Sequence, residues 1–200
     1  MKKIAKTKRR RLVTVLGVAL RSGEMVHLTD EAGTDDPVRG YVVGLSDDFV
    51  LVHLWEPNVM CLNGYLVLAI DQLQSARPID EHRAFPDRAL RHKGITPQAQ
   101  PDILLVDLPG VLSSAGAHFP LLTIELRNHP NSLFVGRIER LTARSIRLRE
   151  VDPDADWGDV EKLRFKDITR VGFGGGYEEA LWLVNRAEGQ IAAEGGSAER

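Results

Sequence analysis

The chain has 200 residues, of which 43% are hydrophobic, and a formal net charge of −2. This composition excludes a chain that is disordered over its whole length, because the apolar side chains suffice for a packed core. A single cysteine, Cys61, excludes an internal disulfide and a cysteine-rich zinc site, and it is typical of a reducing compartment. Cys61 follows the apolar Val59 and Met60, so we interpret it as a small buried hydrophobic residue.

Positive charge is concentrated at the N-terminus. Seven of the 26 basic residues lie in the first eleven positions, and no acidic residue accompanies them. The other 189 residues hold 19 basic and 28 acidic side chains, and an acidic body repels phosphate on average. We interpret residues 1–23 as a basic arm and a first strand. Its candidate contacts with RNA or another partner are Lys8, Arg9, Arg10 and Arg11.

The apolar run at 12–20 follows the basic arm as it would in a signal peptide. No small-x-small cleavage site comes after it, and its nine residues fall short of the about 20 that span a bilayer. Residues 21–24, Arg-Ser-Gly-Glu, are typical of a turn between two strands. We therefore expect a strand in this run, no leader, no membrane association and a cytoplasmic protein.

Short apolar segments separated by turn residues predict ten strands in two sets. The first set is 26–29, 39–44, 49–55, 64–70 and 73–77; the second is 121–127, 134–141, 145–151, 161–165 and 169–173. Alternation along 145–151 places Ile146 and Leu148 on one face and Arg147 and Arg149 on the other. Helical spacing predicts helices at 85–93, 108–119 and 177–184, the second capped by Asp107.

The two sets of strands resemble each other. Segment 40–45 aligns with segment 136–141 at an offset of 96, and the same offset pairs Val50 with Ile146. A pattern that recurs in the same order indicates a duplicated module. The expected organisation is the arm with its strand at 1–23, a first module with a trailing helix at 24–93, a linker at 94–104, a second module with leading and trailing helices at 105–184, and a frayed, flexible tail at 185–200.

A helix followed by five short strands resembles the Sm-like small barrel. Gly40, Val42, Leu45 and Phe49 fall at the glycine and hydrophobic positions of that family's first motif. In the second module, these positions are held by Gly136, Ile138 and Leu141. The resemblance implies a mainly β fold with short helices (α+β), built from two tandem Sm-like five-stranded small barrels.

The resemblance does not extend to a uridine pocket. Val50 and Ile146 stand where uridine-binding Sm proteins carry an asparagine, and the Arg-Gly pair of the second Sm motif is not visible. Segment 165–181 also resembles a run found in bacterial proteins of unknown activity. That likeness implies no activity for this chain.

A glycine run joins a predicted strand to a predicted helix. Backbone N–H groups at such a position can hold an anion, so Gly174, Gly175 and Gly176 form a candidate anion loop. Tyr177 stands where a dinucleotide fingerprint needs its third glycine, and the glutamates that follow repel phosphate. The alternative interpretation is that the glycines allow a sharp turn and close packing.

Signatures of catalysis are weak. Segment 152–158 has alternating acids but not the glycine and glutamate that a calcium loop requires, and the six histidines show no zinc-site spacing. Asp47, Asp48 and Asp167 could act as general acids or bases, yet acids are common in and before turns. The sequence therefore predicts a non-enzyme without a cofactor or metal.

The leading hypothesis is a non-catalytic binding or scaffold protein that recognises a protein or an RNA, with homo-oligomerisation left open. For RNA, the candidate contacts beside the N-terminal arm are Arg137, Arg140, Arg144, Arg147 and Arg149. The alternative is a small enzyme or a nucleotide- or anion-binding protein that uses the glycine run 172–176 with Asp167. A pocket that joins these residues would favour the alternative.

Overall fold

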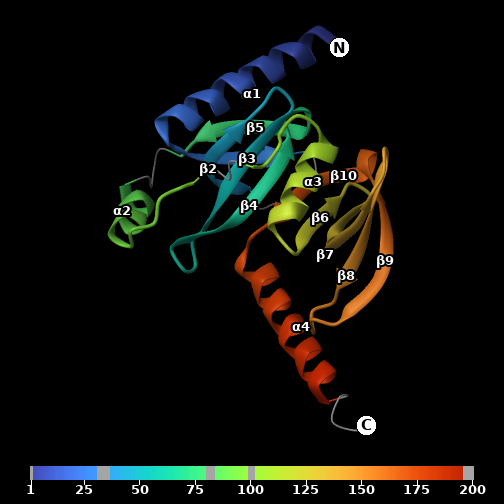
Figure 1. Cartoon of the computed structure of the whole chain (residues 1–200). Helices are drawn as coiled ribbons and strands as arrows, with labels where there is room; N and C mark the ends of the chain where they lie inside the picture. The colour runs from blue at the N-terminus through green and yellow to red at the C-terminus, as the bar shows by residue number, and fades with distance from the viewer. Residues whose placement is uncertain (1, 31–36, 80–83, 99–101, 196–200) are drawn as a thin grey trace.

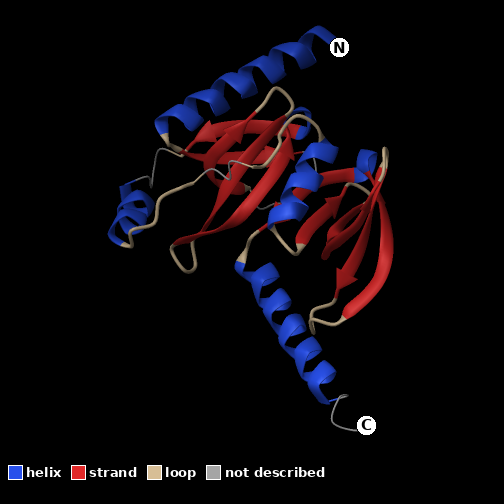
Figure 2. Ribbon diagram, viewed as in Figure 1, coloured by secondary structure: helices blue, strands red, loops and turns tan. Residues whose placement is uncertain are grey.

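The structure is a computed structural model that describes residues 2–30, 37–79, 84–98 and 102–195. Within these residues, ten strands form one open antiparallel sheet, so the chain is mixed α+β (Figure 1). Figure 2 shows helices lying on and beside this sheet. The helices are α1 (Lys2–Ser22), α2 (Ala84–His92), α3 (Leu108–His118) and α4 (Gly176–Gly195).

The ten predicted strands are confirmed, with ends that differ by a few residues. The first five are β1 (Met25–Asp30), β2 (Val38–Leu45), β3 (Phe49–Glu56), β4 (Cys61–Ala69) and β5 (Leu73–Pro78). The other five are β6 (Leu122–Leu126), β7 (His129–Leu141), β8 (Ser145–Val151), β9 (Trp157–Arg164) and β10 (Ile168–Phe173). Single 3-10 turns, η1 (Ile70–Gln72) and η2 (Phe165–Asp167), connect β4 to β5 and β9 to β10.

The predicted pair of closed Sm-like barrels is wrong. The strand order is β5-β1-β2-β3-β4-β10-β6-β7-β8-β9, so the two halves form one continuous sheet. The join is the antiparallel pairing of β4 with β10, in which Tyr65 lies opposite Phe173 and Leu68 opposite Arg170. Both strands are mostly buried, and pairing them covers two apolar edges at once. The more polar β5 and β9 are left at the ends of the sheet.

Glycines allow neighbouring strands to approach closely at the same place in both halves. A Cβ atom on Gly40 would lie 2.3 Å from the backbone oxygen of His53, and one on Gly136 would lie 2.1 Å from that of Arg149. A side chain at either position would push the strands apart. A register shift follows each glycine, between Val42 and Gly44 and between Ile138 and Arg140, and such bulges bend and twist a sheet.

The N-terminal segment is a helix, so the predicted strand at 12–20 is wrong. Its β-branched residues favour a strand locally, but Leu12, Leu16 and Ala19 are spaced for one helical face. All three are buried in a cluster with strands of the first half, and α1 lies across these strands in Figure 1. Gly23, with a φ of 66°, ends the helix and donates its N–H to the Ala19 oxygen at 2.9 Å. Tertiary burial therefore decides the conformation.

One large core cluster draws residues from both halves. It includes Leu51 and Val67 of the first half together with Ile124, Ile146 and Phe173 of the second. The other predicted helices are confirmed: α3 packs on this core, and α2 and α4 begin within a residue of the expected positions. The Asp107 side chain accepts from the Gly110 N–H at 2.7 Å, which is the expected cap. Helix α4 continues to Gly195, through most of the predicted tail.

A buried ion-pair triad ties the two halves together. Arg170 on β10 donates from Nε to Asp30 Oδ2 at 2.8 Å and from Nη2 to Oδ1 at 3.1 Å, and its Nη1 lies 3.3 Å from Glu125 Oε2. Asp30 ends β1, which is separated from β10 by three strands in the sheet order, so the sheet must curve to bring them together. Burial raises the pKa of Glu125, against the lowering effect of the nearby Arg170 charge.

Candidate functional site

The arginines singled out in the second half face one another across β7 and β8. In the strand register, Arg137 lies opposite Arg149 and Arg140 opposite Arg147. The intervening side chain of Leu148 is fully buried, so alternation turns its two arginine neighbours to the outer face. Directly opposed like charges are unfavourable in a sheet, so each pair needs compensation or a partner.

The first of these pairs is compensated within the protein. The Arg137 guanidinium carbon lies 5.0 Å from the centre of the Trp157 ring, within the range of a cation–π interaction. Arg149 donates from Nε to Glu139 Oε1 at 2.6 Å. These two arginines therefore have structural partners, and they are weaker candidates for contacts with a ligand.

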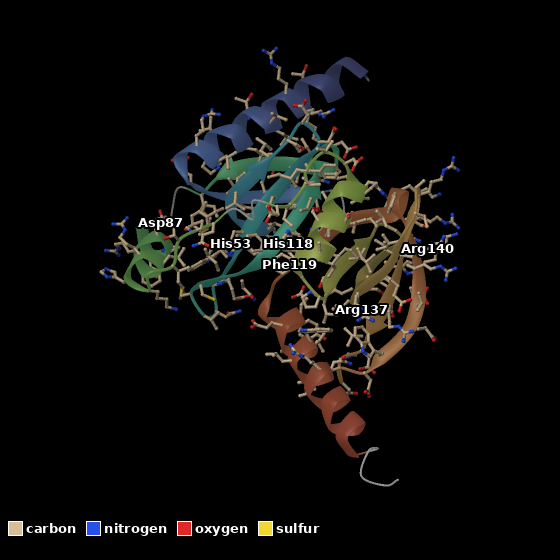
Figure 3. All side chains as sticks on the ribbon, viewed as in Figure 1. His53, Asp87, His118, Phe119, Arg137 and Arg140 are labelled. Carbon is tan, nitrogen blue, oxygen red and sulfur yellow. The ribbon has the colours of Figure 1, made fainter. Side chains whose placement is uncertain are left out.

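The second pair belongs to a larger cationic surface, which we call the basic patch. Arg140, Arg147 and Lys162 occupy one row across β7, β8 and β9. The six exposed members of the patch are Arg140, Arg144, Arg147, Lys162, Arg164 and Lys166. Nitrogen-tipped side chains project from this side of the sheet around Arg140 in Figure 3. Among the described residues, none of the six forms an ion pair with a carboxylate.

A cavity lies at one end of the basic patch. It has a volume of about 510 Å³, and cations from the β7–β8 turn, β9 and η2 surround it. Its walls are Ala143, Arg144, Ser145, Lys162, Arg164, Phe165 and Lys166. Phe165 is half-buried and adds an aromatic wall. The nearby Glu161 lies opposite Leu148, which places it on the other face of β9.

Lys162, Arg164, Lys166 and Phe165 were not among the sequence candidates. Lys162 and Arg164 are spaced by two along a predicted strand, which was an available signal. Their position beside Arg147 depends on the β8–β9 register, in which Arg147 pairs with Lys162. The sequence alone could not predict that register, because β9 begins at Trp157, before the predicted strand at 161–165.

The N-terminal candidates do not join the basic patch. They lie on α1, which packs across the first half of the sheet (Figure 1). Arg9 donates to Asp48 Oδ1 at 2.5 Å and to the Asp47 oxygen at 2.7 Å. Lys8 and Arg11 line a separate cavity beside β5, and Arg10 is exposed. The arm is therefore a structural helix whose cations point in several directions.

The candidate anion loop is filled by the protein itself. The Gly176 N–H donates to the Asn63 side-chain oxygen at 2.8 Å. A Cβ on Gly175 would lie 2.6 Å from a carboxylate oxygen of Glu178, and one on Gly174 would lie 2.6 Å from the Phe119 ring. This geometry favours the packing interpretation of the glycine run over anion binding.

Each of the three acids considered for catalysis has a contact within the protein, which for Asp47 and Asp167 is through the backbone oxygen. Asp48 pairs with Arg9, and the backbone oxygen of Asp167 accepts from the Arg127 N–H at 2.8 Å. Asp167 lines a cavity of about 570 Å³ with residues of β9 and the β6–β7 region, and Gly174, Gly175 and Gly176 are not among its described walls. The pocket that would join Asp167 to the glycine run is therefore not formed there.

An aromatic cluster at the junction of the halves was missed by the sequence reasoning. The His53 ring stacks on Tyr65 with centroids 4.3 Å apart, and Tyr65 stacks on Phe173 at 5.7 Å. Phe119 packs on Phe173 at 4.9 Å, and Figure 3 shows it near His53. Burial lowers the pKa of His53 to about 4, and Nδ1 accepts the Gln98 N–H at 3.3 Å. The neutral imidazole is thus part of the packing.

His53 is expected to make the fold acid-sensitive. Because its pKa falls from an ordinary 6.5 to about 4 on folding, the unfolded chain binds a proton first. The resulting stability is present above pH 6.5 and is lost as the pH falls through about 4. His53→Phe, which keeps the stacking, should lose less stability than the parent between pH 7 and 4.5 in urea titrations. Parallel losses in the two proteins would contradict this expectation.

None of the helices in the described parts of the chain combines the length and apolar character of a membrane-spanning segment. Those residues also hold no group of three or more His, Cys, Asp or Glu side chains that could bind a metal ion. No protein-family model, curated protein or solved structure matches the chain.

Proposed function

We propose that the chain is a non-catalytic, cytoplasmic RNA-binding protein that uses the basic patch on β7, β8 and β9. The observation that carries the proposal is the row of Arg140, Arg147 and Lys162 on three adjacent strands. Neighbouring strands are about 4.8 Å apart, so the row holds three cations across roughly 10 Å. A ligand with closely spaced negative charges fits this arrangement.

The cost of the arrangement supports a polyanionic ligand. Like charges directly opposite one another each oppose sheet formation, by up to about 1 kcal/mol per pair. Arg137 and Arg149 show how this chain relieves such a pair, with an aromatic ring and a glutamate. Arg140, Arg147 and Lys162 have no comparable relief among the described residues. A row of phosphates would neutralise these three cations, and its binding would release counterions.

The composition of the patch favours RNA over an acidic protein. Protein interfaces have an apolar centre from which lysine is depleted, whereas the centre of this patch is cationic. The cavity at its end combines four cations with Phe165, an arrangement that suits phosphates and a nucleobase. A single strand has free bases for such a pocket, so we take single-stranded RNA as the ligand.

The test is fluorescence anisotropy with a labelled single-stranded RNA of twenty nucleotides at several salt concentrations. The double variant Arg147→Glu/Lys162→Glu is expected to weaken binding at least about tenfold. It should also reduce the slope of log K against log salt by about 1.4, because each lost phosphate contact contributes about 0.7 for single strands. Poly-glutamate of equal charge serves as the acidic-protein competitor.

The matched control is Arg10→Glu/Arg91→Glu, which makes the same change in net charge on α1 and α2. It should leave both affinity and salt slope nearly unchanged, since both residues lie outside the patch. The proposal fails if the parent chain does not bind the RNA, or if patch and control variants weaken binding equally. If poly-glutamate displaces the RNA at equal concentration, the ligand of the patch is an acidic protein segment and not RNA.

A further inference from the structure

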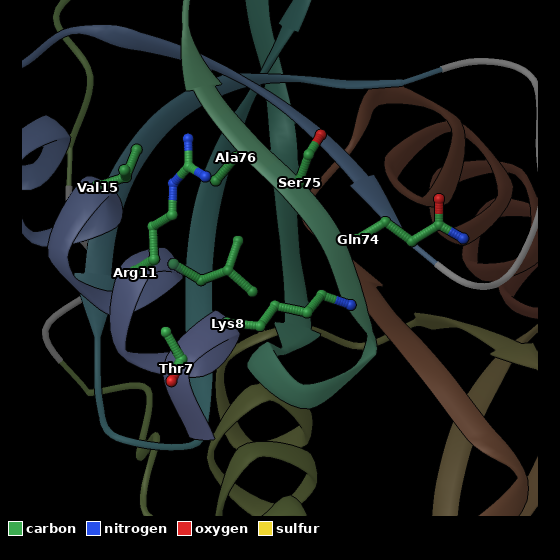
Figure 4. Close-up of a pocket in the computed structure, with 8 residues that line it drawn as sticks. Thr7, Lys8, Arg11, Val15, Gln74, Ser75 and Ala76 are labelled. Atoms are coloured by element: carbon green, nitrogen blue, oxygen red, sulfur yellow. The ribbon is translucent and has the colours of Figure 1, made fainter. Parts of the chain in front are cut away.

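A further cavity lies in the first half of the chain, between α1 and β5. Its volume is about 610 Å³, within the roughly 300–1,000 Å³ of small-molecule sites. The described residues that line it are Thr7, Lys8, Arg11, Leu12, Val15, Gln74, Ser75 and Ala76. Figure 4 shows the helix and the strand forming its two walls.

The walls of this cavity have an apolar part and a cationic part. Leu12, Val15 and Ala76 form an apolar floor, where Leu12 is almost fully buried and the other two are half-buried. Lys8 and Arg11 are three residues apart, hence on one helix face, and Figure 4 shows both side chains extending toward β5. The cavity therefore has an apolar body with cations at its rim.

The two cations are not neutralised within the described residues. Arg9, between them in sequence, pairs with Asp48 at 2.5 Å, which shows that carboxylates are available to α1 on another face. Lys8 and Arg11 form no ion pair of this kind in the described parts of the chain. An anion with an apolar part could pair its charge with the two cations and place its apolar part on the floor. Both the charged rim and the apolar floor would then have a matching partner.

We propose that this cavity binds a small amphiphilic anion, a carboxylate or phosphate attached to an apolar chain. The head group pairs with Lys8 and Arg11, and the chain lies on Leu12, Val15 and Ala76. Gln74 and Ser75 provide polar groups beside the head group; the Ser75 hydroxyl already shares a 2.8 Å hydrogen bond with Thr29.

Two other occupants fit less well. A peptide strand added to the free edge of β5 would meet Pro78, which has no N–H to donate, after only a few residues. An RNA strand would gain from the two cations but would place its polar backbone on an apolar floor. The amphiphilic anion uses both parts of the cavity, and it is independent of the RNA proposed for β7–β9.

The experiment is isothermal titration calorimetry of the full chain with ligands that share one ten-carbon tail. Decanoate and decyl phosphate are expected to bind saturably at one site. Decanol and decyltrimethylammonium, which lack the negative charge, should bind at least about tenfold more weakly. Inorganic phosphate, which lacks the tail, should also bind at least about tenfold more weakly. Amide shifts in the NMR spectrum should concentrate at Gln74, Ser75 and Ala76 in the decanoate titration.

Two variants locate the site. Lys8→Gln/Arg11→Gln should weaken decanoate binding at least about tenfold, whereas Arg10→Gln/Arg21→Gln, which removes the same charge elsewhere on α1, should not. Ala76→Phe fills the cavity and should abolish binding in a chain that circular dichroism shows to be folded. The proposal is overturned by equal binding of decanoate and decyltrimethylammonium, by equal effects of the two double variants, or by no saturable binding of either anion.

Discussion

Replacing Arg170 with methionine is expected to lower the free energy of unfolding by about 3–5 kcal/mol at pH 7. Arg170 is only 8% exposed and bridges Asp30 and Glu125, which belong to strands far apart in the sheet order. Methionine removes the cation and leaves two carboxylates in a poorly hydrated site. Such a loss is a large part of the about 5–15 kcal/mol that stabilises a typical domain. Urea titration followed by tryptophan fluorescence measures it.

The effect of Arg170→Met should depend on pH in a defined direction. Burial raises the pKa of Glu125 above its ordinary value, so protonation of Glu125 stabilises the folded state. That contribution is present at acid pH and is lost as the pH rises through the folded pKa. Without Arg170 the pKa of Glu125 rises further. The difference in unfolding free energy between variant and parent should therefore become smaller as the pH falls from 7 to 4.5.

Two further variants test the cause of this loss. Adding Asp30→Asn and Glu125→Gln to Arg170→Met removes the uncompensated charges and should restore part of the stability at pH 7. Arg91→Met, at an exposed position on α2 outside the basic patch, should change the free energy of unfolding by no more than about 0.5 kcal/mol. Packing and not charge is responsible if the loss of unfolding free energy in Arg170→Met is the same at every pH and is not reduced by adding Asp30→Asn and Glu125→Gln.

Replacing Gly64 with alanine is expected to cost about 3 kcal/mol of unfolding free energy. Gly64 has a φ of 71°, a left-handed conformation that costs other residues about 1–2 kcal/mol. Its Cβ would also lie 2.7 Å from the backbone nitrogen and Cα of Gly175, where overpacking adds about 1–3 kcal/mol. Since backbone cannot rotate away as a side chain can, β4 and the start of α4 must separate. Chemical denaturation of the variant measures the sum.

Gly23→Ala is the matched control for Gly64→Ala. Gly23 has a nearly identical φ of 66°, but no atom lies within 4 Å of the Cβ that alanine would add. Only the conformational cost of about 1 kcal/mol is therefore expected at Gly23. Equal losses in the two variants would show that the contact between Gly64 and Gly175 contributes nothing.

The sequence by itself determined the local elements of this protein. Apolar alternation placed all ten strands, and the Asp107 cap with Pro109 placed the start of α3, because these signals act over a few neighbouring residues. It also placed Arg147 and Arg149 on the outer face, since alternation follows from strand geometry alone. Part of the basic patch was thus predictable.

Only the tertiary structure decided how these elements combine. Residues 12–20 satisfy both a strand and a helix pattern, and burial of Leu16 against the sheet selected the helix. The pairing of β4 with β10 joined two expected barrels into one sheet, because edge pairing depends on strands about 100 residues apart. Asn63 accepts a hydrogen bond from the glycine run, which is similarly distant in sequence. Lys162 lies beside Arg147 because of the β8–β9 register. Such contacts leave no local signal, since their energy arises only when distant segments bury their surfaces together.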